Sequence, residues 1–98
     1  MSTVSVKTAS LANLESLAVL FNQYRQFYEQ NSDLALATEF IQQRIQNAES
    51  VILMAEDAQG KVLGFCQLYP SFCSVEAKPI YALYDLFVLP QYRGHGIG

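Results

Sequence analysis

Residues 80–98 of the chain read IYALYDLFVLPQYRGHGIG. The segment 80–89 is rich in β-branched and aromatic side chains and carries one charge, Asp85, so it predicts a strand that ends at Pro90. Three glycines at alternate positions follow, with Arg93 immediately before the first. Such a turn can aim several backbone N–H groups at one phosphate, with the arginine as a fixed cation beside them. On the glycine spacing alone, a flexible tail is an equally good interpretation.

Three familiar phosphate-binding motifs do not fit this turn. A Walker A loop ends in Gly-Lys-Ser/Thr, which occurs nowhere in the chain. The dinucleotide fingerprint and the kinase glycine loop place their glycines at positions one, three and six. Here Gly94, Gly96 and Gly98 are two apart and follow a late strand. The turn therefore indicates none of these nucleotide-binding classes.

The composition is that of one small folded domain. The chain has 98 residues, of which 51% are hydrophobic and 15% charged, a balance that disfavours disorder. Six Lys and Arg against nine Asp and Glu give a formal net charge of −3. A nucleic-acid binder needs a dense basic face, so we expect no nucleic-acid partner.

The sequence gives no sign of a membrane or secreted protein. The longest apolar run, Val51–Ala55, is far shorter than the roughly 20 residues that span a bilayer. The first residues lack a basic region followed by an apolar core. Cys66 and Cys73 are too few for a disulfide scaffold and lie far apart if they share one strand, although Pro70 could bend the chain back. We expect a cytoplasmic protein with two ordinary thiols and no membrane partner.

Periodicity predicts a mixed sheet with two helices near its start. In the first helix, apolar residues recur at spacings of three and four, and Tyr24, Phe27 and Tyr28 are assigned mainly to the core by this spacing. The expected elements are strands at 3–7, 51–55, 62–69 and 80–89, helices at about 11–29 and 38–48, a turn at 57–60 and a loop at 71–79. Pro70 is expected to end the third strand. The order is β-α-α-β-β-β followed by the glycine-rich turn, an α/β fold with a largely antiparallel sheet.

Residues 83–98 resemble the acyl-CoA-binding segment of the GCN5-related N-acetyltransferases, the GNAT family. The family motif Gln/Arg-x-x-Gly-x-Gly/Ala is met in register by residues 93–98, and the strand before it is most similar to that of diamine (spermidine/spermine-type) acetyltransferases. The element order is similar to the N-terminal half of the acyl-CoA N-acyltransferase fold. The resemblance implies that residues 1–98 are the N-terminal portion of one N-acetyltransferase domain, which stops where the helix after the glycine motif should begin.

The resemblance implies an enzyme that moves an acetyl group from acetyl-CoA to a primary amine of a small molecule or peptide. The amine would attack the thioester directly, and no metal would take part. Backbone groups of the fourth strand would pair with the pantetheine arm, and N–H groups of the turn would hold the pyrophosphate. By position, the residues implied for acetyl-CoA are Leu86, Phe87, Val88, Arg93, Gly94, His95, Gly96 and Gly98. Homodimers are common in the family, but nothing in the sequence fixes an interface.

The sequence departs from the diamine enzymes where they carry Glu-Asp, because here the pair is Tyr84-Asp85. Alternation along a strand places these two residues on opposite faces. We expect Tyr84 to line the substrate cleft and Asp85 to hold neighbouring backbone or a basic partner, with a role as the base left open. Both are candidate catalytic residues, since the amine must lose a proton. At the end of the first helix, Tyr28, Glu29 and Asp33 are candidates for binding a cationic amine.

Other residues carry weaker interpretations. His95 is expected to be a solvated loop residue, and Cys66 and Cys73 lack both the neighbours of a nucleophilic thiol and the four ligands of a zinc site. A second hypothesis is a fold fragment without catalytic activity that binds a protein partner through its edge strand. The 98 residues alone are expected to be nearly inactive, because the resemblance implies further elements. Binding of acetyl-CoA separates the two hypotheses.

Overall fold

The computed structural model describes residues 4–93. The elements in chain order are β1 (Ser5–Thr8), a 3₁₀ turn (Leu11–Asn13), α1 (Leu14–Phe27), α2 (Leu34–Gln46), β2 (Val51–Glu56), β3 (Val62–Cys73), β4 (Lys78–Val88) and a second 3₁₀ turn (Pro90–Tyr92). The predicted order of strands and helices is confirmed, as is the α/β class. The glycine-rich turn lies outside the described residues.

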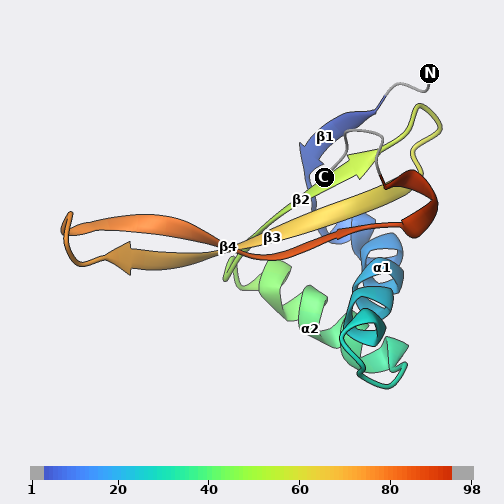
Figure 1. Ribbon diagram of the computed structural model, residues 1–98, viewed down its shortest axis with the longest axis horizontal. Coiled ribbons are helices and arrows are strands. Elements are labelled where there is room, and N and C mark those ends of the chain that lie inside the picture. The colour runs from blue at the N-terminus through green and yellow to red at the C-terminus, as the bar shows by residue number, and fades with distance from the viewer. Residues whose placement is uncertain (1–3, 94–98) are drawn as a thin grey trace.

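The four strands form one antiparallel sheet in the order β1-β2-β3-β4. Both helices lie on one face of this sheet (Figure 1). Because β2, β3 and β4 follow one another through hairpins, β4 is the last strand of the row. Its outer edge has no strand beside it within residues 4–93.

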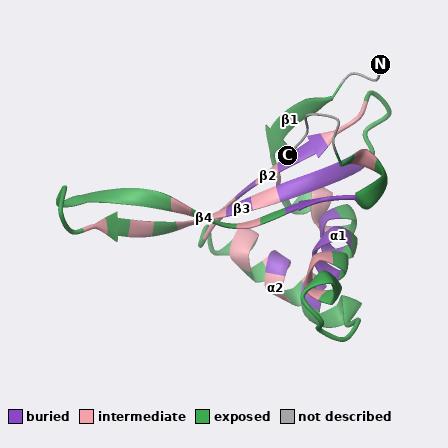
Figure 2. Ribbon diagram, viewed as in Figure 1, coloured by how far each residue is buried: buried purple, intermediate pink, exposed green. Residues whose placement is uncertain are grey.

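The hydrophobic core lies between the helices and the sheet (Figure 2). Leu17 and Phe21 enter it from α1, and Ile41 enters it from α2. From the sheet, Phe65 of β3 and Phe87 of β4 close the other side. Full burial of one such side chain stabilises a fold by roughly 1.5–3 kcal/mol. This layer therefore fixes α1 against the end of β4.

Side chains that bond to backbone hold the connection between the helices. Asn22 is buried on α1, where its Oδ1 accepts from the backbone N–H of Asp33 at 2.9 Å. The Asp33 carboxylate accepts from the N–H of Leu36 at 3.0 Å and caps α2. Consequently α2 begins at residue 34, not at the predicted 38, and α1 ends at residue 27, not at 29.

The predicted loop at 71–79 is wrong. β3 continues through Pro70 to Cys73, and β4 begins at Lys78, so a short turn joins them. β2 pairs with β3 only as far as Leu68, so β4 is the single neighbour of β3 at Pro70. An edge strand tolerates a residue without an N–H. The two strands leave the sheet together and project from it (Figure 1).

β4 contains a bulge at Tyr84. Gln67 pairs with Asp85, whereas the next residue of β3 pairs with Leu83, so Tyr84 is the additional residue. The rings of Tyr69 and Tyr84 are in T-shaped contact, with centroids 5.3 Å apart. Gln67 and Tyr69 are two residues apart on β3 and share a face, so their neighbours Asp85 and Tyr84 share it too. The predicted placement on opposite faces is wrong, because an inserted residue resets the alternation.

Candidate functional site

A cleft of about 260 Å³ lies between the end of α1 and the last residues of β4. The residues that line it are Tyr24, Phe27 and Tyr28 of α1, Leu86, Phe87 and Val88 of β4, and Arg93. Five of these are sequence-predicted site residues from distant parts of the chain: four nominated for acetyl-CoA, together with Tyr28 for the amine. The fold brings them to one place.

Along this cleft, β4 turns alternate backbone groups outward. The N–H of Leu89 donates to the carbonyl of Leu63 at 2.9 Å, which identifies the residues of β4 that bond to β3. Because bonded and non-bonded positions alternate in an antiparallel pair, the backbone of Phe87 faces β3. The backbone groups of Leu86 and Val88 face the open edge. These two residues have the orientation that the prediction requires, and Phe87 does not.

The two strands approach closely beside the cleft because residue 64 is glycine. Gly64 pairs with Val88. A Cβ atom on Gly64 would lie 2.8 Å from the carbonyl oxygen of Phe87 and 3.3 Å from the Cα of Val88. Any side chain here would push β4 away from β3, so this glycine fixes the position of the cleft wall.

Arg93 closes one end of the cleft. Its Nε donates to the carbonyl of Val88 at 2.8 Å. Its guanidinium carbon lies 5.4 Å from the ring centroid of Phe27 and 5.3 Å from that of Phe87. Aromatic faces attract a guanidinium, and its planar fork suits phosphate or carboxylate oxygens. The structure thus holds a permanent cation at the end of β4.

Two polar side chains, those of Tyr24 and Gln67, hold Asp85. The prediction that Asp85 holds neighbouring backbone or a basic side chain is therefore wrong. Its Oδ1 accepts from the Tyr24 hydroxyl at 2.9 Å, and its Oδ2 accepts from Gln67 Nε2 at 2.9 Å. Gln67 has no exposed surface and accepts from Ser50 Oγ at 2.7 Å. A carboxylate offers about four acceptor positions. Two donors therefore orient Asp85 without exhausting its capacity to accept a proton.

The pKa values of Tyr24 and Tyr69 are raised, so both of these tyrosines remain protonated at neutral pH. Burial raises the pKa of Tyr24 well above its usual range, and the hydrogen bond to Asp85 raises it further. Burial also raises the pKa of Tyr69, with a smaller contribution in the same direction from the charge of Asp85. Tyr24 is therefore a dependable hydrogen-bond donor to the carboxylate.

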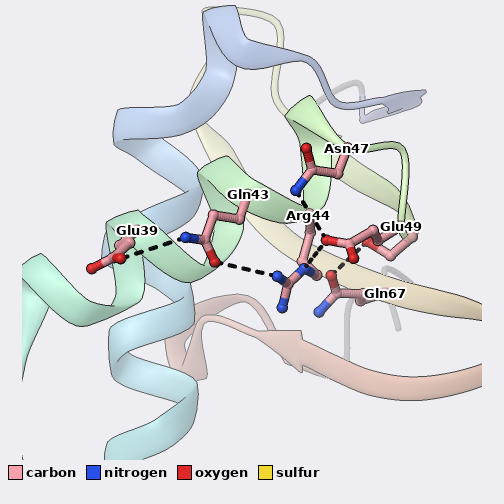
Figure 3. Close-up of polar contacts among 7 residues, drawn as sticks. Glu39, Gln43, Arg44, Asn47, Glu49 and Gln67 are labelled. Atoms are coloured by element: carbon pink, nitrogen blue, oxygen red, sulfur yellow. Dashed lines mark hydrogen bonds and ion pairs between the residues drawn. The ribbon is translucent and has the colours of Figure 1, made fainter.

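Charged side chains at the carboxyl end of α2 support the other end of this network (Figure 3). Arg44 Nε pairs with Glu49 Oε1 at 3.0 Å, and Asn47 donates to the same oxygen at 3.4 Å. These contacts fix the turn that precedes β2. Ser50 lies in that turn and donates to Gln67, so the orientation of Asp85 depends on packing as far away as α2.

Several predicted residues are not brought to the cleft. The carboxylate of Asp33 is engaged in the cap of α2, and Glu29 is exposed with a left-handed φ of 65° just after α1. Neither lines the cleft. The remaining members of the predicted acetyl-CoA set, Gly94, His95, Gly96 and Gly98, lie outside the described residues.

Three residues of the site have no site role in the sequence analysis. Tyr24 and Phe27, which line the cleft, are assigned there to the core, and Gln67, which holds Asp85, has no role. One signal was available for Gln67, because an amide inside the apolar run VLGFCQLY must find polar partners when buried. For Tyr24, its partner Asp85 is 61 residues away in the chain, and no local pattern reports such a contact.

The cysteines show no features of a reactive or metal-binding site. Cys66 and Cys73 are free thiols on β3, and burial raises the pKa of the Cys66 thiol, which lowers its reactivity. Residues 4–93 include no group of three His, Cys, Asp or Glu side chains that could hold a metal ion.

None of the helices within residues 4–93 is long and apolar enough to cross a membrane. A larger hollow of about 480 Å³ beside α1 contains none of the predicted site residues.

The fold and the cleft together define a class of protein. An antiparallel sheet with two helices on one face matches the acyl-CoA N-acyltransferase fold. Residues 14–98 match the model of the Acetyltransferase (GNAT) family. The chain belongs to this family, and the predicted resemblance is confirmed.

Relatives and solved structures agree with this assignment. The chain is 50% identical over 95 residues to the uncharacterized N-acetyltransferase YhfO of Bacillus subtilis (strain 168), a match that covers 97% of this chain and 63% of the relative. A crystal structure of a probable acetyltransferase has a TM-score of 0.88 at 38% identity and covers 95% of this chain and 62% of its own. A predicted acetyltransferase with acetyl-CoA from Clostridium acetobutylicum shares the fold, with a TM-score of 0.76 at 12% identity over 97% and 66% of the two chains. The chain spans less than two thirds of the first two relatives.

Proposed function

We propose that the protein containing these residues is an acetyl-CoA-dependent N-acetyltransferase that acts on a primary amine of a small molecule or peptide. One observation carries the proposal: the open edge of β4 forms a wall of the cleft whose end holds Arg93. A narrow apolar cleft with exposed backbone groups suits an extended arm that contains amides, and a guanidinium suits the phosphate end of the same molecule. Acetyl-CoA has both parts. The fold is shared with a solved acetyltransferase that contains it.

The proposed binding of acetyl-CoA divides between two groups of residues. The backbone N–H and C=O groups of Leu86 and the N–H of Val88 pair with the pantetheine arm, and the Phe87 ring closes the cleft behind it. Arg93 and the N–H groups of Gly94, His95, Gly96 and Gly98 bind the pyrophosphate, as the resemblance implies. Free thiols on β3 agree with a cytoplasmic site of action.

Asp85 is the proposed proton acceptor. When bound, acetyl-CoA supplies the thioester whose carbonyl carbon a neutral amine attacks, so a C–N bond forms, a C–S bond breaks and the amine loses a proton. Asp85 takes that proton directly or through water, while Tyr24 and Gln67 hold the carboxylate in one orientation. Without them a flexible carboxylate would spend less time in a productive geometry.

The amine approaches beside aromatic side chains in this proposal. Tyr84, which is 68% exposed, lies in the bulge next to Asp85, and Tyr28 lies at the end of α1. Aromatic faces attract an ammonium group before it is deprotonated. Glu29 adds negative charge near Tyr28, whereas Asp33 acts in the cap of α2. The identity of the amine follows from a substrate screen.

Calorimetric titration of the protein, purified as its gene encodes it, with acetyl-CoA tests the proposal. Release of the CoA thiol is then followed with polyamines, amino acids, aminoglycosides and peptides with free amino termini. Arg93→Gln is expected to weaken acetyl-CoA binding about tenfold, the loss of one charge-assisted hydrogen bond. Lys7→Gln makes the same change of charge on β1 and leaves the affinity unchanged. Absence of acetyl-CoA binding would overturn the proposal.

The second candidate function is a protein-interaction module without catalysis. The open edge of β4 favours it, since an unpaired strand edge can receive a strand from another chain. This candidate requires no affinity for acetyl-CoA. The same titration therefore decides between the two candidates.

A further inference from the structure

Two cationic side chains at the end of β4 have no carboxylate partner within residues 4–93. Three of the six cations of the chain form ion pairs in this range, those of Lys7, Arg44 and Lys78. Arg25 lies in the last turn of α1, where the helix dipole stabilises a cation. Lys61 and Arg93 remain. The cleft described above accounts for Arg93, and Lys61 has no role so far.

Lys61 lies beside the segment that leads from β4 to the glycine motif. Its Nζ donates to the Tyr92 hydroxyl oxygen at 3.3 Å and lies 5.3 Å from the centroid of the Tyr92 ring. Tyr92 packs against the hydrophobic core and directly precedes Arg93. Lys61 and Arg93 are therefore held at the same end of β4, each against different aromatic rings.

Asp57 orders the turn that ends at Lys61. Its Oδ1 accepts from the backbone N–H groups of Gln59 and Lys61, both at 2.9 Å. Its own N–H donates to the Lys61 carbonyl at 2.9 Å. The backbone of Lys61 is thus fixed by Asp57 and its ammonium group by Tyr92. A side chain that is already positioned loses less freedom when it binds an anion.

Lys61 also lines the hollow of about 480 Å³ beside α1, which adjoins the cleft. On α1, Gln23 lines the hollow and Tyr24 lines the cleft; after β4, Leu89 lines the hollow and Val88 lines the cleft. The volume is within the range of ligand pockets. The hollow combines buried apolar side chains with hydroxyl and amide groups, a lining that suits a heterocyclic base and a sugar; these residues are Leu20, Val62, Leu89, Ser16, Gln23 and Gln91.

Glu15 is the second charged side chain that lines the hollow. It lies in the first turn of α1, where the helix dipole stabilises a carboxylate. Because Glu15 and Lys61 cancel in charge, the hollow does not attract anions in general. A phosphate group is stabilised there at one place, the Lys61 ammonium.

We propose that Lys61 binds the 3′-phosphate of acetyl-CoA and selects this carrier over forms that lack that phosphate. The inference rests on the proposed function, in which the pantetheine arm lies in the cleft and the pyrophosphate lies at Arg93. Beyond its pyrophosphate, acetyl-CoA carries an adenosine whose ribose bears the 3′-phosphate. The adjoining hollow accepts this end of the molecule. An ammonium has three donors and Tyr92 accepts from one, so two remain for phosphate oxygens.

Calorimetric titration of the protein, purified as its gene encodes it, with acetyl-CoA and with 3′-dephospho-acetyl-CoA tests the proposal. The unchanged protein is expected to bind acetyl-CoA about tenfold more tightly, the gain from one charge-assisted contact. In Lys61→Gln this preference is expected to fall to about twofold or less through loss of affinity for acetyl-CoA alone. Circular dichroism is expected to stay unchanged, because Lys61 is exposed.

Two further variants separate Lys61 from the other cations. Arg93→Gln is expected to weaken the binding of both carriers alike and to keep the preference, because it acts on the pyrophosphate that both contain. Lys7→Gln removes the same charge from β1 and is expected to change neither affinity. Equal weakening of both carriers in Lys61→Gln would place Lys61 at the pyrophosphate, which contradicts the proposal.

The titrations distinguish failure of this proposal from failure of the proposed function. An unchanged protein that binds both carriers equally, or a Lys61→Gln variant that keeps the full preference, would overturn the role of Lys61. Either result leaves the proposed N-acetyltransferase in place, since acetyl-CoA still binds. A protein that binds neither carrier would overturn both.

Discussion

The two halves of β4 have similar apolar residues and opposite surroundings. In the arm, which is the part of the β3–β4 ribbon beyond β2 (residues 69–82), Tyr81 is 60% exposed. Phe87, near the other end of β4, is 5% exposed. The difference lies in the neighbours: α1 covers the second half and nothing among residues 4–93 covers the first. Similar side-chain chemistry is therefore exposed in one half and forms the wall of a cleft in the other.

The bulge at Tyr84 is the boundary between the halves. On the arm side, residues alternate in one register, and on the cleft side they alternate in another. This shift puts Asp85 and Phe87 on the face toward α1, where Tyr24 contacts both of them. A strand without the bulge would carry its apolar pattern through one register and could not supply both surfaces.

The largest effect is expected for Asp85→Asn. This change keeps the size of the side chain and removes its ability to take a proton, so kcat is expected to fall about 100-fold or more. Acetyl-CoA affinity, measured by calorimetry, is expected to stay within about twofold. Glu39→Gln removes an exposed carboxylate from α2 and serves as the control. A variant that keeps its kcat would assign the proton to another acceptor.

Gly64→Ala is expected to destabilise the cleft half of β4. The new Cβ would meet the Phe87 carbonyl at 2.8 Å, so the free energy of unfolding should fall by about 1–3 kcal/mol in urea denaturation. Acetyl-CoA should also bind more weakly, because β4 must move. Gly60→Ala is the matched control: its φ of 82° costs about 1 kcal/mol, but no atom lies within 4 Å. Equal losses and equal affinities in the two variants would disprove the close approach.

Tyr24→Phe tests the link between α1 and Asp85. Removal of one hydrogen bond should lower the free energy of unfolding by about 1 kcal/mol at pH 7. The folded-state pKa of Tyr24 is raised, so in the unchanged protein its contribution is present below the unfolded value of about 10 and is lost as the pH rises above it.

The difference between the two proteins, measured by urea denaturation, should therefore shrink as the pH rises above about 10. Tyr81→Phe, on the arm, removes a hydroxyl without a described side-chain partner and is the matched control for the loss of a hydroxyl. A difference that stays constant would show that Tyr24 does not titrate abnormally.

The smallest effect is expected in the arm. Val75 is 97% exposed in the turn, so Val75→Ser should change the free energy of unfolding by less than about 0.5 kcal/mol. Val62→Ser, at the buried start of β3, should cost about 2 kcal/mol because it places a hydroxyl in the core. Similar losses in the two variants would mean that the turn is covered in solution.

The order of elements could be predicted from the sequence because it depends on local patterns. Helical spacing placed Leu17 and Phe21 on a buried stripe, and an apolar run predicted β2. The ends of elements were less accurate. Pro70 did not end β3, since the effect of proline depends on whether the neighbouring edge is paired.

The candidate site was predictable in part. Leu86, Val88 and Arg93 follow from the strand and the motif, and Tyr28 from its place at the end of a helix. The bulge could not be predicted, because one additional residue in a strand leaves no periodic signal over so short a run. The partners of Asp85 could not be predicted either, because Tyr24 and Gln67 lie 61 and 18 residues away.

By itself, the sequence determined that a mixed sheet forms, that its fourth strand leads to a glycine-rich motif, and that the family is GNAT. These properties depend on side-chain periodicity and on residues that are close together in the chain. The tertiary structure alone decided which face Tyr84 and Asp85 share, which backbone groups of β4 remain open, and that half of the strand projects as an arm. Each depends on register or on the presence of a neighbouring element, and both arise only when distant segments pack.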